Sequence, residues 1–193
     1  MAQARTLNEQ EIQQVLDYIS TRKHALRDHT MLLVSHLSGM RVGEIAALTI
    51  GHVLDAGHQI RAEIRLTAAQ TKGKHPRTVF LNKRLREVLA SYVDTVRTDD
   101  PERALFPTQK NPRAGFSSNS LTQHFANLYA GSGLDGATSH SGRRTYATNI
   151  ASQGVGLRVL MRLMGHRNVS TTAVYIDAND DMLRKAVELV SHA

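Results

Sequence analysis

Residues 59–66 read QIRAEIRL, with an apolar residue at every second position. Side chains alternate between the two faces of a strand, so this pattern predicts a half-buried β-strand and not a helix. Residues 71–76, TKGKHP, have the composition of a turn, and residues 78–81, TVFL, indicate a returning strand. The sequence therefore predicts one antiparallel β-hairpin with a basic tip.

Helical spacing of apolar residues dominates on both sides of this hairpin. The capping-box pattern Thr6-Leu7-Asn8-Glu9 predicts a first helix over about residues 7–21. Residues 107–118 are rich in Pro, Gly, Ser and Asn, which indicates a loop. Further helices are predicted over residues 25–37, 41–48, 82–97, 119–131, 141–153, 156–164, 170–177 and 179–191. The expected fold class is therefore mostly α with a small antiparallel β-sheet (α+β).

The composition is that of an ordinary globular protein. The 193 residues are 41% hydrophobic and 21% charged, which suits one domain whose core needs no disulfide. The chain has no Cys, so disulfides and thiolate zinc sites are excluded. No run approaches the roughly 18 apolar residues that span a bilayer, and residues 1–5 lack the apolar core of a signal peptide. We therefore expect a cytoplasmic protein.

The charge balance is strongly basic. Lys and Arg number 24 against 17 Asp and Glu, which gives a net charge of +7 and a pI near 10. A polyanion such as nucleic acid is a natural partner for such a protein. Many soluble proteins are basic without such a partner, so the charge alone leaves both interpretations open.

Three segments contain the residue types that phosphodiester chemistry needs. They are Gly39-Met40-Arg41-Val42-Gly43-Glu44, His140-Ser141-Gly142-Arg143, and Gly165-His166 with Tyr175 nine positions after the His. A guanidinium suits the non-bridging oxygens of a phosphate because it donates two parallel hydrogen bonds and stays charged. This points to Arg41 and Arg143 as a phosphate clamp. Taken alone, Arg41 is better explained by an ion pair with Glu44 three positions later, and the surrounding motif reverses this preference.

Together these segments resemble the tyrosine recombinase, or phage integrase, family. Its signature is Gly-x-Arg-x-x-Glu, then His-x-x-Arg, then Gly-His and a Tyr nine positions on. The segment Thr71-Lys72-Gly73-Lys74 is similar to the hairpin that carries the family's catalytic Lys, and the resemblance covers residues 7–190. It implies the catalytic-domain fold of that family. The catalytic residues that it implies are Arg41, Lys72, His140, Arg143, His166 and Tyr175.

The resemblance gives each of these residues a role. Tyr175 is the nucleophile that attacks phosphorus and forms a covalent phosphotyrosine. A free Tyr has a pKa of about 10, so it needs a proton acceptor and a cationic environment. His140 is suited to acid–base catalysis, and His166 would donate a hydrogen bond to the phosphate. Lys72 would protonate the leaving 5′ oxygen, with Lys74 as its competitor and a basic turn that contacts phosphate as the simpler alternative. No metal, cofactor or ATP is implied.

The other basic residues are candidates for contacts to a DNA backbone, which would make binding salt-dependent. They are Arg77, Lys83, Arg84, Arg113, Arg144, Arg158, Arg162 and Arg167. Two positions depart from the family's second segment: Gly142 stands where Leu is usual, and Arg144 where His is frequent. A Gly costs about 1 kcal/mol in a helix, so Gly142 would loosen the helix start that aims Arg143.

The resemblance also bears on domain organisation. We expect residues 1–193 to form a single catalytic domain, without the separate N-terminal core-binding domain that family members typically carry. That organisation is similar to small single-domain fimbrial-switch invertases. Residues 178–193 carry an apolar stripe at helical spacing. This C-terminal helix either packs on its own domain or docks on a neighbouring protomer.

The function that the resemblance implies is site-specific recombination of double-stranded DNA through a 3′-phosphotyrosine at Tyr175. It further implies a homo-tetramer on DNA, accessory DNA-bending proteins and a place at the nucleoid, and leaves integration, excision and inversion open. Two alternatives share the same residues. One is a non-catalytic DNA-binding regulator, and the other is a type IB topoisomerase that relaxes supercoils. The short step from His166 to Tyr175 favours recombination.

Overall fold

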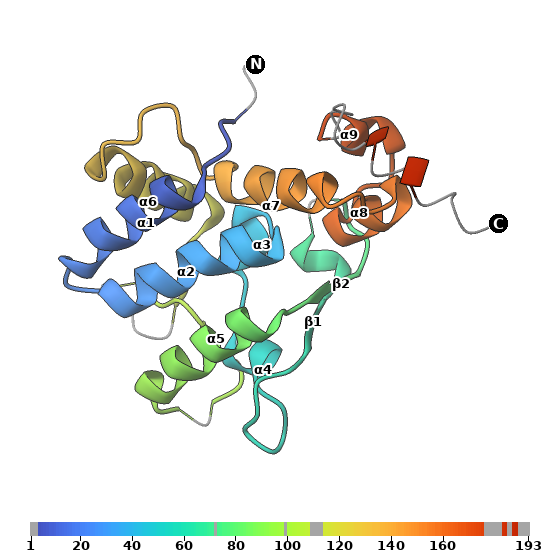
Figure 1. Cartoon of the computed structure of the whole chain (residues 1–193). Helices are drawn as coiled ribbons and strands as arrows, with labels where there is room; N and C mark the ends of the chain where they lie inside the picture. Colours follow the sequence, from blue (N-terminus) through green and yellow to red (C-terminus); the bar gives the residue numbers. More distant parts are fainter. Residues whose placement is uncertain are drawn as a thin grey trace.

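A computed structural model describes residues 4–71, 73–98, 100–108 and 114–175, together with 183–184 and 187–188. Within these ranges the chain is mostly helical and carries a two-stranded antiparallel sheet (Figure 1). The helices are α1 (Glu9–Ser20), α2 (Ala25–Ser38), α3 (Val42–Ala46), α4 (Ile50–Val53), α5 (Lys83–Val96), α6 (Ser118–Gly131), α7 (Ser141–Ser152), α8 (Leu157–Met164) and α9 (Val169–Ala173). The strands are β1 (Glu63–Leu66) and β2 (Arg77–Phe80), with a 3-10 turn over Ala68–Gln70 between them. The predicted fold class is confirmed.

The predicted hairpin is formed by β1 and β2. Ile64 lies opposite Val79 in the register, and both side chains are buried, as the alternating pattern predicts. Strand β1 starts at Glu63, later than the pattern indicates. The reason is a turn ahead of it, in which the Asp55 carboxylate accepts hydrogen bonds from two backbone N–H groups over 2.9 Å. Ile60 makes an isolated bridge only.

Helix α1 begins two residues later than its predicted start. The capping box is formed by Asn8 and Glu11: the Asn8 side chain accepts from the Glu11 N–H, and the Glu11 carboxylate accepts from the Asn8 N–H. The prediction that Thr6 and Glu9 form this box is wrong. The preceding segment is held elsewhere, because Leu7 is buried and its N–H donates to the Thr145 hydroxyl over 2.9 Å.

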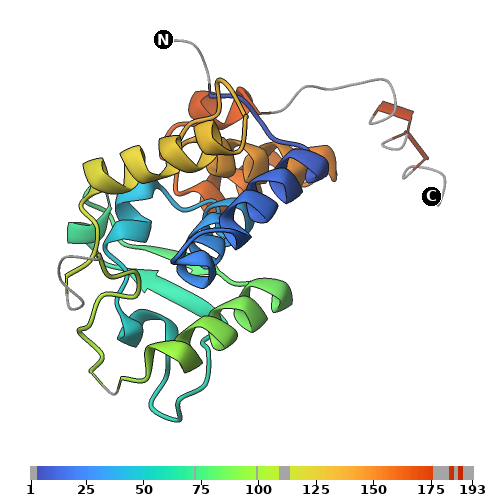
Figure 2. The same ribbon diagram turned by 90° about the vertical axis from the view of Figure 1, so that its left-hand side faces the viewer.

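The main core forms around α2. Helices α1, α5 and α7 pack against it, and α5 lies across the molecule from α6 with α2 between them (Figure 2). Side chains of residues 31–34 are all buried there, which is expected for a helix with neighbours on every side. Helix α2 ends at Ser38, and Gly39 follows with a left-handed φ of 61°.

A second, smaller apolar cluster holds the end of the described chain. Ala147 and Ala151 of α7 bury against Leu160 and Met164 of α8, and Tyr175 packs against this cluster. Figure 1 shows α8 and α9 grouped at one end of α7, beside the hairpin. Helix α9 ends at Ala173, so Tyr175 follows the helix and does not lie within it as predicted.

Residues 178–193, for which a helix was predicted that packs on its own domain or docks on a neighbouring protomer, lie largely outside the described residues. Of that segment, Leu183 and Val187 are described, and both side chains are exposed. Among the described residues, no helix is both long and apolar enough to cross a membrane.

Candidate active site

The guanidinium of Arg143 joins three parts of the chain. Arg143 lies in the first turn of α7 and is 5% exposed. Its Nη1 donates to the Gly39 carbonyl at 2.5 Å, and its Nη2 donates to the Met164 carbonyl at 2.5 Å. These carbonyls lie at the C-terminal ends of α2 and α8, where the partial charge is negative and a cation is stabilised. Nη2 also lies 2.9 Å from Nε2 of His166.

Arg41 and Arg77 share one buried carboxylate. The Arg41 Nη1 donates to Oε1 of Glu44 at 3.1 Å, and the backbone N–H of Arg41 donates to Oε2 at 2.7 Å. Arg77 donates to the same two oxygens from Nε at 3.1 Å and Nη2 at 2.7 Å. Burial opposes ionisation of Glu44, but the hydrogen bonds and charges of Arg77 and Arg41 outweigh it and keep the pKa of Glu44 below its ordinary value.

The site has an excess of positive charge. Three guanidinium groups, those of Arg41, Arg77 and Arg143, face one carboxylate, that of Glu44, which leaves two positive charges uncompensated. Burial, followed by the charges of Arg41 and Arg77, lowers the pKa of Arg143 from its ordinary value. Because a guanidinium nevertheless stays protonated near neutral pH, the arrangement favours an anionic ligand.

His166 is a neutral imidazole in this arrangement. A guanidinium can only donate, so Nε2 of His166 accepts from Arg143. The ring proton is therefore assigned to Nδ1, which lies 2.9 Å from the hydroxyl of Thr172. Burial, then the charges of Arg143, Arg41 and Arg77, lowers the pKa of His166 to about 4.

Tyr175 lies beside His166. The two ring centroids are 6.1 Å apart and the ring planes differ by 18°. The backbone N–H of Tyr175 donates to the Thr172 carbonyl at 3.1 Å, so Thr172 contacts both residues. His166 thus lies between Tyr175 and Arg143, since it contacts both. The arrangement can thus hold an anion next to a phenol.

The structure does not bring all six predicted residues together. It gathers Arg41, Arg143, His166 and Tyr175. His140 is the residue before α7, and its side chain is exposed and makes no hydrogen bond to the other candidates in the described part of the chain. Lys72 lies outside the described residues. The predictions for these two residues are neither supported nor contradicted.

A groove of about 940 Å³ opens at this site. Its lining includes Arg41 and His166 from the site, Thr71 and Gly73 from the hairpin turn, and Arg167. Arg162 also lines it, and none of the described lining residues is acidic. A basic concave surface of this kind attracts a polyanion. The predicted role of Arg162 and Arg167 as backbone contacts is consistent with this position.

Two residues of the site were missed by the sequence reasoning. Arg77, predicted to contact a DNA backbone, lines the groove but is only 8% exposed at its side chain, and it spends three of its five N–H groups on protein partners. The signal was present, because Arg77 shares the inward face of its strand with Val79 and an inward Arg needs a buried partner. Thr172 was not considered, although it precedes Tyr175 by three positions, close to one helical turn.

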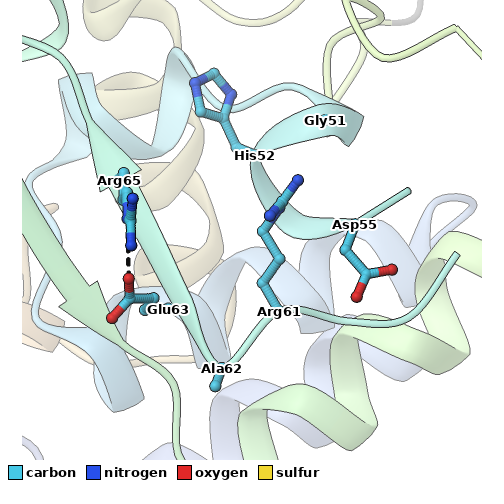
Figure 3. A pocket seen from close by; sticks show the side chains of 7 residues that line it. All are labelled: Gly51, His52, Asp55, Arg61, Ala62, Glu63 and Arg65. Carbon is cyan, nitrogen blue, oxygen red and sulfur yellow. Dashed lines mark hydrogen bonds and ion pairs between the residues drawn. The ribbon is translucent and has the colours of Figure 1, made fainter. Parts of the chain in front are cut away.

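A second hollow, of about 450 Å³, lies between α4 and β1 (Figure 3). Figure 3 shows Arg65 paired with Glu63, over 2.9 Å, on the outer side of β1. His52 is also engaged, since its Nδ1 accepts from the Thr49 N–H at 3.0 Å. This hollow contains none of the candidate residues and its polar groups are paired locally. Across the described ranges, no three His, Asp or Glu side chains gather as metal ligands would.

Comparison with known proteins agrees with this geometry. A model described as the phage integrase family matches residues 5–182. The chain belongs to the phage integrase family. The matched range contains Arg41, Arg143, His166 and Tyr175.

Curated relatives carry the name tyrosine recombinase. The chain is 28% identical to tyrosine recombinase XerA from Thermococcus kodakarensis over 186 residues, which are 95% of this chain and 62% of XerA. It is 32% identical to tyrosine recombinase XerC from Herpetosiphon aurantiacus over 160 residues, which are 81% of this chain and 49% of XerC. The chain thus spans about half to three fifths of these relatives.

The fold is shared with solved structures of the family. A crystal structure of XerA recombinase superposes with a TM-score of 0.74 at 25% identity and covers 98% of this chain and 66% of XerA. The Tn1549 transposon integrase in complex with transposon right end DNA gives a TM-score of 0.74 at 18% identity, over 99% of this chain and 67% of that chain. The second likeness concerns the fold alone.

Proposed function

We propose that this chain is the catalytic part of a site-specific DNA recombinase that cleaves and rejoins strands through a 3′-phosphotyrosine at Tyr175. The observation that carries the proposal is the position of Tyr175 beside His166, which lines a basic groove and accepts a hydrogen bond from Arg143. The tyrosine recombinases named above supply the reaction class.

Phosphate binding comes first in this proposal. Arg41 uses one side-chain donor on Glu44, so its other donors can reach a non-bridging oxygen. Arg143 spends three of the five N–H groups of a guanidinium on Gly39, Met164 and His166. Two N–H groups remain for a second oxygen. Donors that are already fixed by buried partners need little reorganisation when charge develops in the transition state.

Cleavage then exchanges one phosphoester for another. The Tyr175 oxygen attacks phosphorus, a P–O bond to Tyr175 forms, and the P–O5′ bond breaks. The phenol proton passes to His140 and the 5′ oxygen takes a proton from Lys72, in the roles expected for these residues. Attack by a 5′-hydroxyl of the partner strand reverses the step and restores Tyr175. Because the phosphoester is conserved throughout, the reaction needs no external energy source.

Partners follow from the same proposal. The substrate is double-stranded DNA, and exchange between two sites requires a tetramer in which residues 178–193 would dock on a neighbouring protomer. Accessory DNA-bending proteins and a location at the nucleoid belong to the same expectation. The chain would supply the catalytic domain, and strand exchange would need the protomers to cooperate.

A covalent capture experiment tests the proposed function. The protein is incubated with sheared genomic DNA, denatured, and the DNA that remains attached is sequenced. Recovery of one recurrent sequence with its 3′ end on the protein is expected. DNA that binds natively but is lost completely on denaturation would support a non-catalytic regulator, and attachment at scattered sequences with relaxed plasmid products would support a topoisomerase.

A further inference from the structure

The side chain of Arg77 is largely buried, and each of its three nitrogen atoms donates a hydrogen bond. Its Nε and Nη2 donate to Glu44, and its Nη1 donates to the Leu163 carbonyl at 2.9 Å. The side chain is 8% exposed although the residue starts the strand that leads out of the hairpin turn. Arg77 borders the groove, but all three of its hydrogen bonds go to partners inside the protein.

The partners of Arg77 lie next to the two halves of the proposed phosphate site. Glu44 binds Arg41 as well, and Leu163 lies in the last turn of α8, three residues before His166. Contact continues at Gly165, where φ is 60° and an added Cβ would overlap the Cδ of Arg77. Arg77 therefore connects the hairpin, α3 and the turn that carries His166.

The carboxylate of Glu44, which Arg41 and Arg77 share, links Arg77 to phosphate binding. Glu44 is 1% exposed, and a buried carboxylate needs cationic partners to remain ionised. With Arg77 present, Nη1 is the one side-chain nitrogen of Arg41 that donates to a described residue. Without Arg77, Glu44 would have Arg41 as its one ion-pair partner, and its vacant acceptor sites would draw further donors of Arg41 away from the groove.

We infer that Arg77 is a positioning residue for strand cleavage: it satisfies Glu44 so that Arg41 stays available to the phosphate, and it fixes the turn ahead of His166. The inference rests on the proposed function. It requires no contact between Arg77 and DNA, so loss of Arg77 acts on the cleavage step and not on DNA binding.

The test separates these two steps in single-turnover reactions on captured target DNA. The Arg77→Met variant should cleave about 10- to 100-fold more slowly, as expected for a misplaced catalytic group. Its DNA affinity should stay within about twofold of the wild-type value, because many contacts to the DNA backbone contribute to that affinity. Arg77→Lys, which keeps the positive charge but not the several donors of a planar guanidinium, should recover part of the rate. Arg65→Met is the matched control, since Arg65 lies in the paired strand and its side chain is 85% exposed.

A double variant distinguishes positioning from a general folding role. If Glu44 captures Arg41 once Arg77 is gone, Glu44→Gln combined with Arg77→Met should cleave faster than Arg77→Met alone. A double variant as slow as the product of the two single effects would overturn the inference. So would wild-type cleavage rates in Arg77→Met, or a loss of DNA affinity that matches the loss of rate.

Failure of the proposed function would be seen separately. If the wild type and Arg65→Met form no covalent complex, the recombinase proposal fails. The effect of Arg77 on Glu44 can then be measured directly. Carboxyl NMR titration should then show a higher pKa of Glu44 in Arg77→Met than in the wild type, because its strongest partner is gone. An unchanged Glu44 titration would overturn the positioning role.

Discussion

Nη2 of Arg143 lies 2.9 Å from Nε2 of His166, and the imidazole accepts this hydrogen bond. Nε2 is the atom that would donate to a phosphate oxygen. In this structure it carries no proton, and its lone pair points at the guanidinium of Arg143. To donate from Nε2, His166 must release Arg143 and place a proton on Nε2, either by taking one up or by moving its ring proton from Nδ1. A phosphate placed between them favours both changes, because it binds the guanidinium and stabilises an imidazolium.

The titration of His166 checks this relationship. In the free protein, ring-nitrogen NMR should show a pKa of about 4 and a proton on Nδ1. Orthovanadate, as a phosphate mimic, should raise this pKa because its negative charge offsets those of the three arginines. A pKa near that of a free His in the unliganded protein would contradict the assignment.

The same shift predicts a pH dependence of stability. The pKa of His166 is lower in the folded than in the unfolded state, so the unfolded chain binds the proton first as the pH falls. The contribution of His166 to stability is fully present above about pH 6.5 and declines toward pH 4. A shift of this size corresponds to at most about 3 kcal/mol, and solvent access to the ring makes the loss smaller. His36, with a pKa lowered to about 4 by burial, adds a slope of the same sign. Urea unfolding at pH 7 and pH 5 should therefore show a smaller difference for His166→Gln than for the wild type.

Thr172 should be needed for the Nδ1 proton of His166. The Thr172→Val variant keeps the shape but removes the only hydroxyl at 2.9 Å from Nδ1 among the described residues. We expect about a tenfold loss of cleavage rate, the size of one buried hydrogen bond of about 1.4 kcal/mol. Thr172→Ser restores the hydroxyl and should restore most of the rate. Equal rates for Val and Ser variants would exclude a role for this contact.

Gly142 should resist substitution despite its helical position. An added Cβ would overlap the Ser35 side chain, so α7 packs on α2 at the distance that Gly allows. Helix propensity alone predicts that Gly142→Ala stabilises by up to about 1 kcal/mol. Overpacking typically costs 1–3 kcal/mol, so we expect net destabilisation of about 1 kcal/mol. Gly156→Ala, which meets open space, is the control, and Gly142→Ala with Ser35→Gly should recover stability in thermal unfolding.

DNA binding should depend on salt through the groove arginines. Each of Arg162→Ala and Arg167→Ala is expected to weaken binding across sequences and to lower the slope of log affinity against log salt by about one. Arg65→Ala, outside the groove, should leave the slope unchanged. Fluorescence anisotropy at several salt concentrations measures all three. Equal slopes for the groove variants and the wild type would indicate that DNA binds outside this groove.

Local patterns predicted the elements of this fold well. The alternation of residues 60–66 identified β1, and its apolar positions Ile64 and Leu66 are buried. Helical spacing located α5 and α6 to within a residue at each end. These features depend on neighbours along the chain, which a sequence displays directly. Boundaries failed where a distant partner decided them, as at Leu7, whose N–H is held by Thr145.

The site was predictable in its residue types and not in its contacts. The motif spacing pointed to Arg41, Arg143, His166 and Tyr175 as catalytic residues; of these, Arg143 and Tyr175 both contact His166, and the catalytic roles stay a prediction. The partners of Arg143 are backbone carbonyls of Gly39 and Met164, which every residue carries and no pattern marks. Gly142 appeared as a weakness of its helix, whereas Ser35 lies against it and leaves room for no larger residue.

The central claim is that Tyr175 becomes covalently attached to DNA. The most direct test traps the protein on a target duplex with a nick beside the scissile phosphate, followed by digestion and mass spectrometry of the attached peptide. We expect a nucleotide-bearing peptide that contains Tyr175, and Tyr175→Phe should bind the duplex as tightly yet form no covalent complex. A covalent complex that persists in Tyr175→Phe, or attachment at another residue, would contradict the account.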